Sequence, residues 1–86
     1  MGYHINVIKK GTIGEFSKIQ EEFDELIDAH EQDAAILELC ELSDLYGAIN
    51  AYVQSKYNLS IEDIQKMSNL TVSAFKDGSR KWLIII

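Results

Sequence analysis

Residues 21–52 read EEFDELIDAHEQDAAILELCELSDLYGAINAY, and this stretch decides the expected fold. It holds four carboxylates in two pairs, Glu22 with Glu25 and Glu41 with Asp44, and the members of each pair are three positions apart. On a helix, residues three apart lie one above the other on nearly the same face. Each pair can therefore present two oxygen ligands to one point, and two antiparallel helices would bring all four carboxylates together.

Apolar residues recur at helical spacing around both pairs. The first stripe predicts an amphipathic helix that begins near Thr12 or slightly later, where Thr12 and Glu15 have the form of a capping box, and ends near His30. This stripe consists of Phe16, Ile19, Phe23, Leu26 and Ile27. A second helix is predicted over about Ala34–Tyr57, with Asp33 as its N-cap. Its main stripe consists of Leu42, Leu45, Ile49 and Val53.

The remaining elements flank this hairpin. Ser60, followed by acids in the first turn, reads as the N-cap of a third helix over about Ile61–Phe75, with Gly78 as its stop. The alternation in Tyr3–Ile8 suggests a short strand, and the apolar segment Trp82–Ile86 could pair with it in the same chain or a partner's. The expected fold class is therefore all-α: a helical hairpin plus a third helix, assembling into an oligomeric helical bundle, with the option of short terminal strands.

Length and composition limit the biological role. The 86 residues make one domain, and 47% of them are hydrophobic. A domain of this size buries only about 60 to 65% of its unfolded surface, so we expect a homo-oligomer. The net charge of −6 argues against a nucleic-acid polymer as partner, because binding such a polymer needs a basic stripe.

The single cysteine, Cys40, is expected to be a buried apolar residue and fits a reducing compartment. No apolar run reaches the roughly 18 residues that span a bilayer, and the N-terminus lacks the apolar core of a signal peptide, so the expected location is cytoplasmic.

The clustered carboxylates suggest metal chemistry. Without cations they would repel one another, whereas Mg²⁺ takes oxygen ligands and shares its sites with substrate phosphates. Bound ions can screen phosphate oxygens and hold an activated water for in-line attack, so the favoured reaction class is phosphoanhydride hydrolysis. Glu38 falls inside the apolar stripe and is either a further ligand or a helix-end residue that reaches solvent. Glu21 and Asp24 point away from the stripe and are expected on the surface, while His4 has no partner that the sequence identifies.

The spacing of the acids also matches a family signature. Glu22-Phe-Asp-Glu25, followed after fifteen residues by Glu41-Leu-Ser-Asp44, resembles the ExxE…ExxD motif of the MazG-like all-α NTP pyrophosphatase superfamily, and most of all its dCTP pyrophosphatase-like branch. This resemblance implies Mg²⁺-dependent hydrolysis of a nucleoside triphosphate to a monophosphate and pyrophosphate, by dimers or tetramers with sites at helix interfaces. The four acids carry over as catalytic metal ligands.

Candidates for substrate binding lie further along the chain. Lys66 and Asn69 match the family's next helix more weakly and are implied as phosphate or base contacts. Arg80 is a candidate on chemical grounds, because a guanidinium matches phosphate oxygens bidentately. The alternative from another functional class is a non-catalytic helical oligomer or a nucleotide-binding regulatory adaptor, in which the acidic faces serve solubility.

Overall fold

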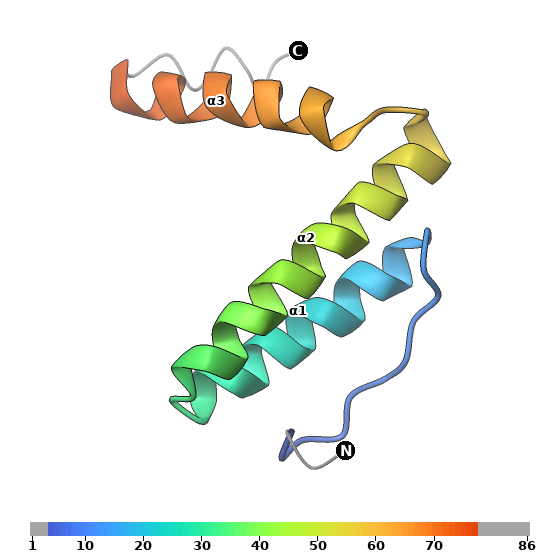
Figure 1. Cartoon of the computed structure of the whole chain (residues 1–86), viewed down its shortest axis with the longest axis vertical. Coiled ribbons are helices and arrows are strands. Elements are labelled where there is room, and N and C mark those ends of the chain that lie inside the picture. The colour runs from blue at the N-terminus through green and yellow to red at the C-terminus, as the bar shows by residue number, and fades with distance from the viewer. Residues whose placement is uncertain (1–3, 78–86) are drawn as a thin grey trace.

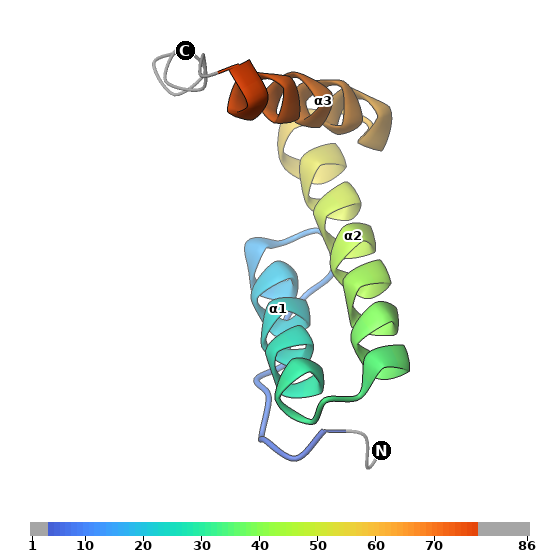
Figure 2. The ribbon, with the colours of Figure 1, turned by 90° about the vertical axis from the view of Figure 1, so that its left-hand side faces the viewer.

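The computed structural model describes residues 4–77, except for the side chains of residues 74, 75 and 77. Within this range the chain forms three α-helices, α1 (Phe16–Glu31), α2 (Ala35–Tyr57) and α3 (Ile61–Asp77), and no strand. Helices α1 and α2 lie side by side as an antiparallel hairpin, and α3 leaves the far end of α2 at an angle (Figures 1 and 2). The predicted all-α class is confirmed, with the helices close to their expected positions.

The start of α1 is set by a turn. The backbone N–H of Glu15 donates to the carbonyl of Thr12 over 3.0 Å, and Gly14 adopts a φ of 89°, which glycine tolerates at no steric cost. The helix therefore begins at Phe16, with Glu15 as an N-cap that makes no side-chain capping hydrogen bond. The capping box predicted at Thr12 does not form, because this turn separates Thr12 from the helix.

The connection between α1 and α2 also differs from prediction. Asp33 donates its N–H to the carbonyl of His30 over 3.0 Å and has a φ of 56°, a left-handed conformation that aspartate accepts more readily than most residues. Ala34, not Asp33, is the N-cap of α2, again without a side-chain capping bond. The prediction for Asp33 was wrong because this residue closes the turn after α1 and does not open the next helix.

The segment before α1 runs along the hairpin as an extended arm, residues 4–10, shown in dark blue in Figure 1. The predicted strand is wrong for these residues, because the N–H groups of Ile5 and Asn6 donate to the side chain of Asp28 and not to a strand. Tyr3 and the proposed partner strand, residues 82–86, lie outside the described residues. The arm passes so close to α1 that a Cβ on Gly11 would lie 2.2 Å from a backbone oxygen of the helix.

In the hairpin, acidic side chains are buried and large apolar side chains are exposed, which is the inverse of the burial in an ordinary pair of amphipathic helices. The buried apolar residues are few and small: Ala29, Ala48 and Val53. Four acids are buried beside them: Glu21, Glu22, Asp28 and Glu41. Large apolar side chains from all three helices remain exposed, among them Phe16, Phe23, Leu39, Tyr46 and Leu70. Cys40 is exposed too, so its predicted burial is wrong, because α1 covers only one side of α2.

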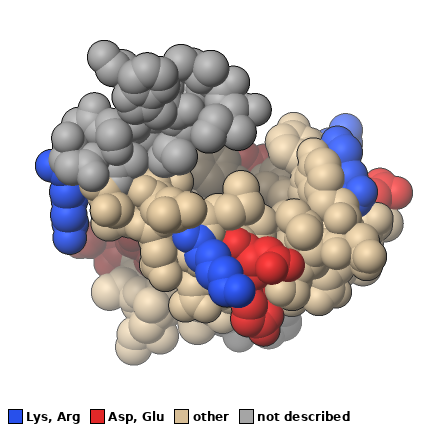
Figure 3. All heavy atoms as spheres, turned by 90° about the horizontal axis from the view of Figure 1, so that it is seen from above, with Lys and Arg blue, Asp and Glu red and all other residues tan. Residues whose placement is uncertain are grey.

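Helix α3 begins at the predicted cap. Ser60 donates its N–H to Oδ2 of Asp63 over 2.9 Å, and the N–H of Asp63 donates back to Oγ of Ser60 over 3.3 Å. This reciprocal pair is a capping box, and the left-handed Asn58 ends α2 just before it. Seen from above, the end of the molecule that carries α3 presents a broad surface with only scattered charged side chains (Figure 3). None of the helices described within residues 4–77 is long and apolar enough to cross a membrane.

Replacing Asp63 with alanine should fray the first turn of α3 at neutral pH. Hydrogen bonds from the backbone and side chain of Ser60 hold the pKa of the Asp63 carboxyl below its ordinary value. Its stabilising effect is therefore complete above the unfolded pKa of about 3.9 and is lost as the pH falls through the lowered folded pKa. Amide hydrogen exchange at residues 60–64 should be faster in the variant at pH 7, and NMR shifts of the two proteins should converge near pH 2. The exposed neighbour Glu62→Ala is the control.

Candidate metal centre

The hairpin brings the two predicted acid pairs together. Glu22, Glu41 and Asp44 each offer a carboxylate oxygen, and these three atoms lie within 4.8 Å of one another. Glu25 belongs to two neighbouring groups with the same spacing, one with Glu21 and Glu22 and the other involving Glu41. The convergence expected from the three-residue spacing is therefore present, across the interface of α1 and α2.

Two acids of this cluster are buried, and one oxygen of each accepts no hydrogen bond from the described residues. Glu22 and Glu41 are each 5% exposed, and Oε2 of each has no hydrogen-bond partner among the residues that the structure describes. Buried polar atoms in folded proteins nearly always have a partner, so each exception calls for an explanation such as an ion. Asp44 is exposed and Glu25 is half-buried, so the cluster is open to solvent on one side.

The electrostatics of the cluster favour protons or cations. Burial, followed by the neighbouring Glu25 carboxyl, raises the pKa of Glu22 against the opposing charge of Lys18. Burial, followed by the Glu41 carboxyl, raises the pKa of Glu25. Both shifts have the sign expected for carboxylates that share a desolvated space. A divalent ion placed among these oxygens would supply the missing counter-charge.

Glu21 is a buried acid that the sequence did not reveal. It is 3% exposed, so its predicted surface position is wrong, whereas Asp24 is exposed as predicted. Oε1 of Glu21 accepts the N–H of Gly11 over 2.8 Å and the Nζ of Lys18 over 3.1 Å. Burial acts to raise the pKa of Glu21, but these bonds, with the charges of Lys18 and Lys10, hold it below its ordinary value. Helical periodicity could not reveal the burial of Glu21, because the residues that cover it belong to the segment before α1 and not to a helix.

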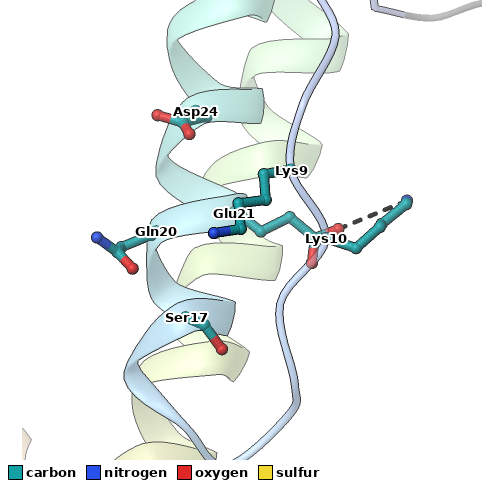
Figure 4. A pocket seen from close by; sticks show the side chains of 6 residues that line it. All are labelled: Lys9, Lys10, Ser17, Gln20, Glu21 and Asp24. Atoms are coloured by element: carbon teal, nitrogen blue, oxygen red, sulfur yellow. Dashed lines mark ion pairs between the residues drawn. The ribbon is translucent and has the colours of Figure 1, made fainter.

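A cavity of about 170 Å³ lies where the arm meets this side of α1. It is lined by Lys9, Lys10, Ser17, Gln20, Glu21 and Asp24. In Figure 4 the dashed line marks the ion pair between Nζ of Lys10 and Oε2 of Glu21, at 3.6 Å. A lysine and a carboxylate of this lining are thus already paired with each other, and the lining does not point to a particular ligand.

Asp28 holds the arm against the hairpin by hydrogen bonds. Its side chain is 1% exposed and accepts hydrogen bonds from Nδ1 of His4 (2.8 Å), the N–H of Ile5 (3.1 Å), both nitrogens of Asn6, and Nε2 of Gln32 (2.8 Å). Burial acts to raise the pKa of Asp28, but these donors together hold it below its ordinary value. This junction could not be predicted from the sequence, because its donors from the arm lie more than twenty residues before Asp28, in a segment without helical periodicity.

None of the other predicted site residues that the structure describes is brought to the cluster. Glu38 lies at the start of α2, where its Oε1 is 3.3 Å from Nδ1 of His30, and it belongs to none of the acidic groups found within the described chain. Lys66 is exposed on α3. Asn69 lines a different cavity, between α2 and α3, together with Tyr46. Arg80 lies outside the described residues.

Comparison of the chain with protein-family models, with curated proteins and with solved structures finds no match in any of the three. The resemblance to MazG-like enzymes therefore stays a prediction from the four acids and their spacing.

Proposed function

We propose that the protein is a Mg²⁺-dependent nucleoside triphosphate pyrophosphohydrolase that converts a (d)NTP and water to a (d)NMP and pyrophosphate. The observation that carries this proposal is that Glu22 and Glu41, each of which has a buried oxygen without a hydrogen-bond partner in the described chain, lie in one group with Asp44. The same acids match the family motif, so geometry and resemblance select the same residues.

Each acid has a distinct part in this proposal. Glu22, Glu25, Glu41 and Asp44 would hold Mg²⁺, which supplies charge to the phosphate oxygens and lowers the pKa of an attacking water. Glu22 and Glu41 hold their carboxylates inside the hairpin, where little water competes for them. Asp44 stands on the exposed side, where a triphosphate can approach. Lys18 lies 3.3 Å from Oε1 of Glu22 and offsets part of the negative charge before metal binds.

Magnesium should stabilise the folded protein. An ion that binds only the native state raises the free energy of unfolding by about 2.7 kcal/mol at one hundred times its Kd. We expect millimolar MgCl₂ to raise the Tm of the wild-type chain and to leave the Tm of Glu22→Gln unchanged. Melting in NaCl of equal ionic strength controls for screening, and an equal response to both salts would contradict the proposed metal centre.

A panel of ribo- and deoxyribonucleoside triphosphates, incubated with the protein and Mg²⁺, tests the reaction itself. Equal amounts of monophosphate and pyrophosphate are expected, with no free phosphate. Release of phosphate and a diphosphate would show cleavage at the other phosphoanhydride bond. If no nucleotide is hydrolysed, the enzymatic proposal is wrong.

We also propose that the chain assembles into a homodimer or homotetramer. Ile36 and Leu39 on α2 are 81% and 67% exposed, and one turn of the helix places them side by side. Patches of this kind on several helices are typical of association surfaces. The wild type should therefore sediment as an oligomer, and Leu39→Asp should shift it towards monomer. The matched control is Gln54→Asp, at an exposed polar position of the same helix; if Leu39→Asp sediments like wild type, this patch is not the interface.

A non-catalytic nucleotide-binding adaptor is the second candidate. The observation in its favour is that Lys66 and Asn69 stand on α3, away from the acidic cluster. Such an adaptor would gain stability from Mg²⁺ and a nucleotide together and yet release no pyrophosphate.

A further inference from the structure

His4 is oriented by the junction at Asp28. The other groups that Asp28 bonds to are all N–H donors, from Ile5, Asn6 and Gln32, so the carboxylate acts as the acceptor. Nδ1 of His4, 2.8 Å from Oδ2 of Asp28, therefore carries the hydrogen of that bond. In the neutral ring, this leaves the lone pair on Nε2. A carboxylate that fixes the ring in this way is the usual outer partner of a metal-binding histidine.

The free nitrogen faces the acidic cluster. Nε2 of His4 is 3.7 Å from Oε1 of Glu41, which is too long for a hydrogen bond. One ligand atom from each of His4, Glu25 and Glu41 lies within 4.8 Å of the others. Independently of the histidine, the second oxygen of Glu41 is buried without a hydrogen-bond partner in the described chain. Three ligand atoms thus lie close together, and Glu41, the carboxylate that faces Nε2 of His4, has a second oxygen without a hydrogen-bond partner in the described chain.

We infer that His4, Glu25 and Glu41 form a second cation position that binds a first-row transition-metal ion through Nε2 of His4. Imidazole nitrogen favours such ions, whereas a set made only of carboxylates suits Mg²⁺. Glu41 belongs to this group and also to the group with Glu22 and Asp44, so its carboxylate would link two unlike positions. This inference rests on the proposed metal centre and adds a nitrogen ligand from the arm.

Cobalt is a direct probe of that nitrogen. Full-length protein without an affinity tag is titrated with Co²⁺ and, separately, with Mg²⁺ by calorimetry, and proton NMR spectra of the Co²⁺ protein are recorded. We expect one strongly shifted, solvent-exchangeable signal, from the Nδ1–H that His4 donates to Asp28. His4→Gln should lose this signal and bind Co²⁺ at least about tenfold more weakly, while its Mg²⁺ affinity changes much less.

His30 provides the matched control, because it is the only other histidine in the chain and is exposed on the last turn of α1. His30→Gln should keep both the shifted signal and the Co²⁺ affinity. Because this variant shows which histidine binds Co²⁺, it tests the inference even if His4→Gln does not fold. Loss of the signal in His30→Gln, or Co²⁺ binding without any such signal, overturns the inference and leaves a Mg²⁺ site intact. If neither ion binds, the proposed function fails together with it.

Discussion

Glu41→Gln is expected to lower Mg²⁺-dependent pyrophosphate release by at least about a hundredfold while the far-UV circular dichroism spectrum stays unchanged. Bound ions contribute several kcal/mol to the stabilisation of transition-state charge, and each loss of about 1.4 kcal/mol is tenfold in rate. An amide is a poor substitute, because it has one oxygen and no charge. The measurement is the initial rate of pyrophosphate release at saturating Mg²⁺, compared with wild type.

The metal-free form of the same variant gives an independent check. Glu41 is crowded by Glu22, Glu25 and Asp44, so removing its charge should relieve repulsion and leave the apo Tm equal to or above that of wild type. Glu31→Gln, at an exposed position on α1, is the control and should change neither quantity. Undiminished turnover in Glu41→Gln would remove Glu41 from the site and the proposal with it.

Asp28→Asn should release the N-terminal arm and give the largest loss of stability among the single substitutions considered. The amide keeps the volume of the side chain but brings its own N–H groups towards donors from His4, Ile5 and Asn6. A buried donor left facing another donor loses its hydrogen bond and its access to water. We expect the amides of Ile5 and Asn6 to exchange with solvent about ten- to a hundredfold faster, as measured by NMR.

The matched control for this variant is Asp24→Asn, one turn earlier on the same helix and exposed. It should melt like wild type and leave exchange in the arm unchanged. If Asp28→Asn also melts like wild type and protects Ile5 and Asn6 as well as before, the arm is held by contacts other than this carboxylate.

The sequence predicted those features that depend on helical periodicity. The three helices follow from apolar residues at spacings of three and four. The cap at Ser60 follows from a serine before an acidic first turn. The convergence of Glu22 with Glu41 follows from the three-residue spacing of acids on two neighbouring helices. These features are local, or they involve one hairpin with a short connection. The same reasoning placed Asp24 correctly on the surface and failed for Glu21, because the angle around a helix does not show what else covers a residue.

The features that the sequence did not predict depend on the arm, which has no period. Coverage of Glu21 by Gly11, and the capture of His4 by Asp28, pair residues across a coil whose path is set by single hydrogen bonds. Cys40 was misplaced for a different reason. The stripe on α2 shows which residues are apolar but not how many neighbours the helix has, and the described chain covers only one side of it.

The inverted burial of the hairpin has a consequence for the proposed enzyme, whose turnover would depend on its concentration. In a single chain the acids lie inside while Leu39 and Tyr46 face water, so in the proposed oligomer the arrangement of acids would gain stability from contacts between copies. Specific activity would then fall on dilution below the concentration at which the oligomer dissociates and recover on concentration, even with Mg²⁺ and nucleotide held constant. Cells making little of this protein would contain it mainly in a weakly active form.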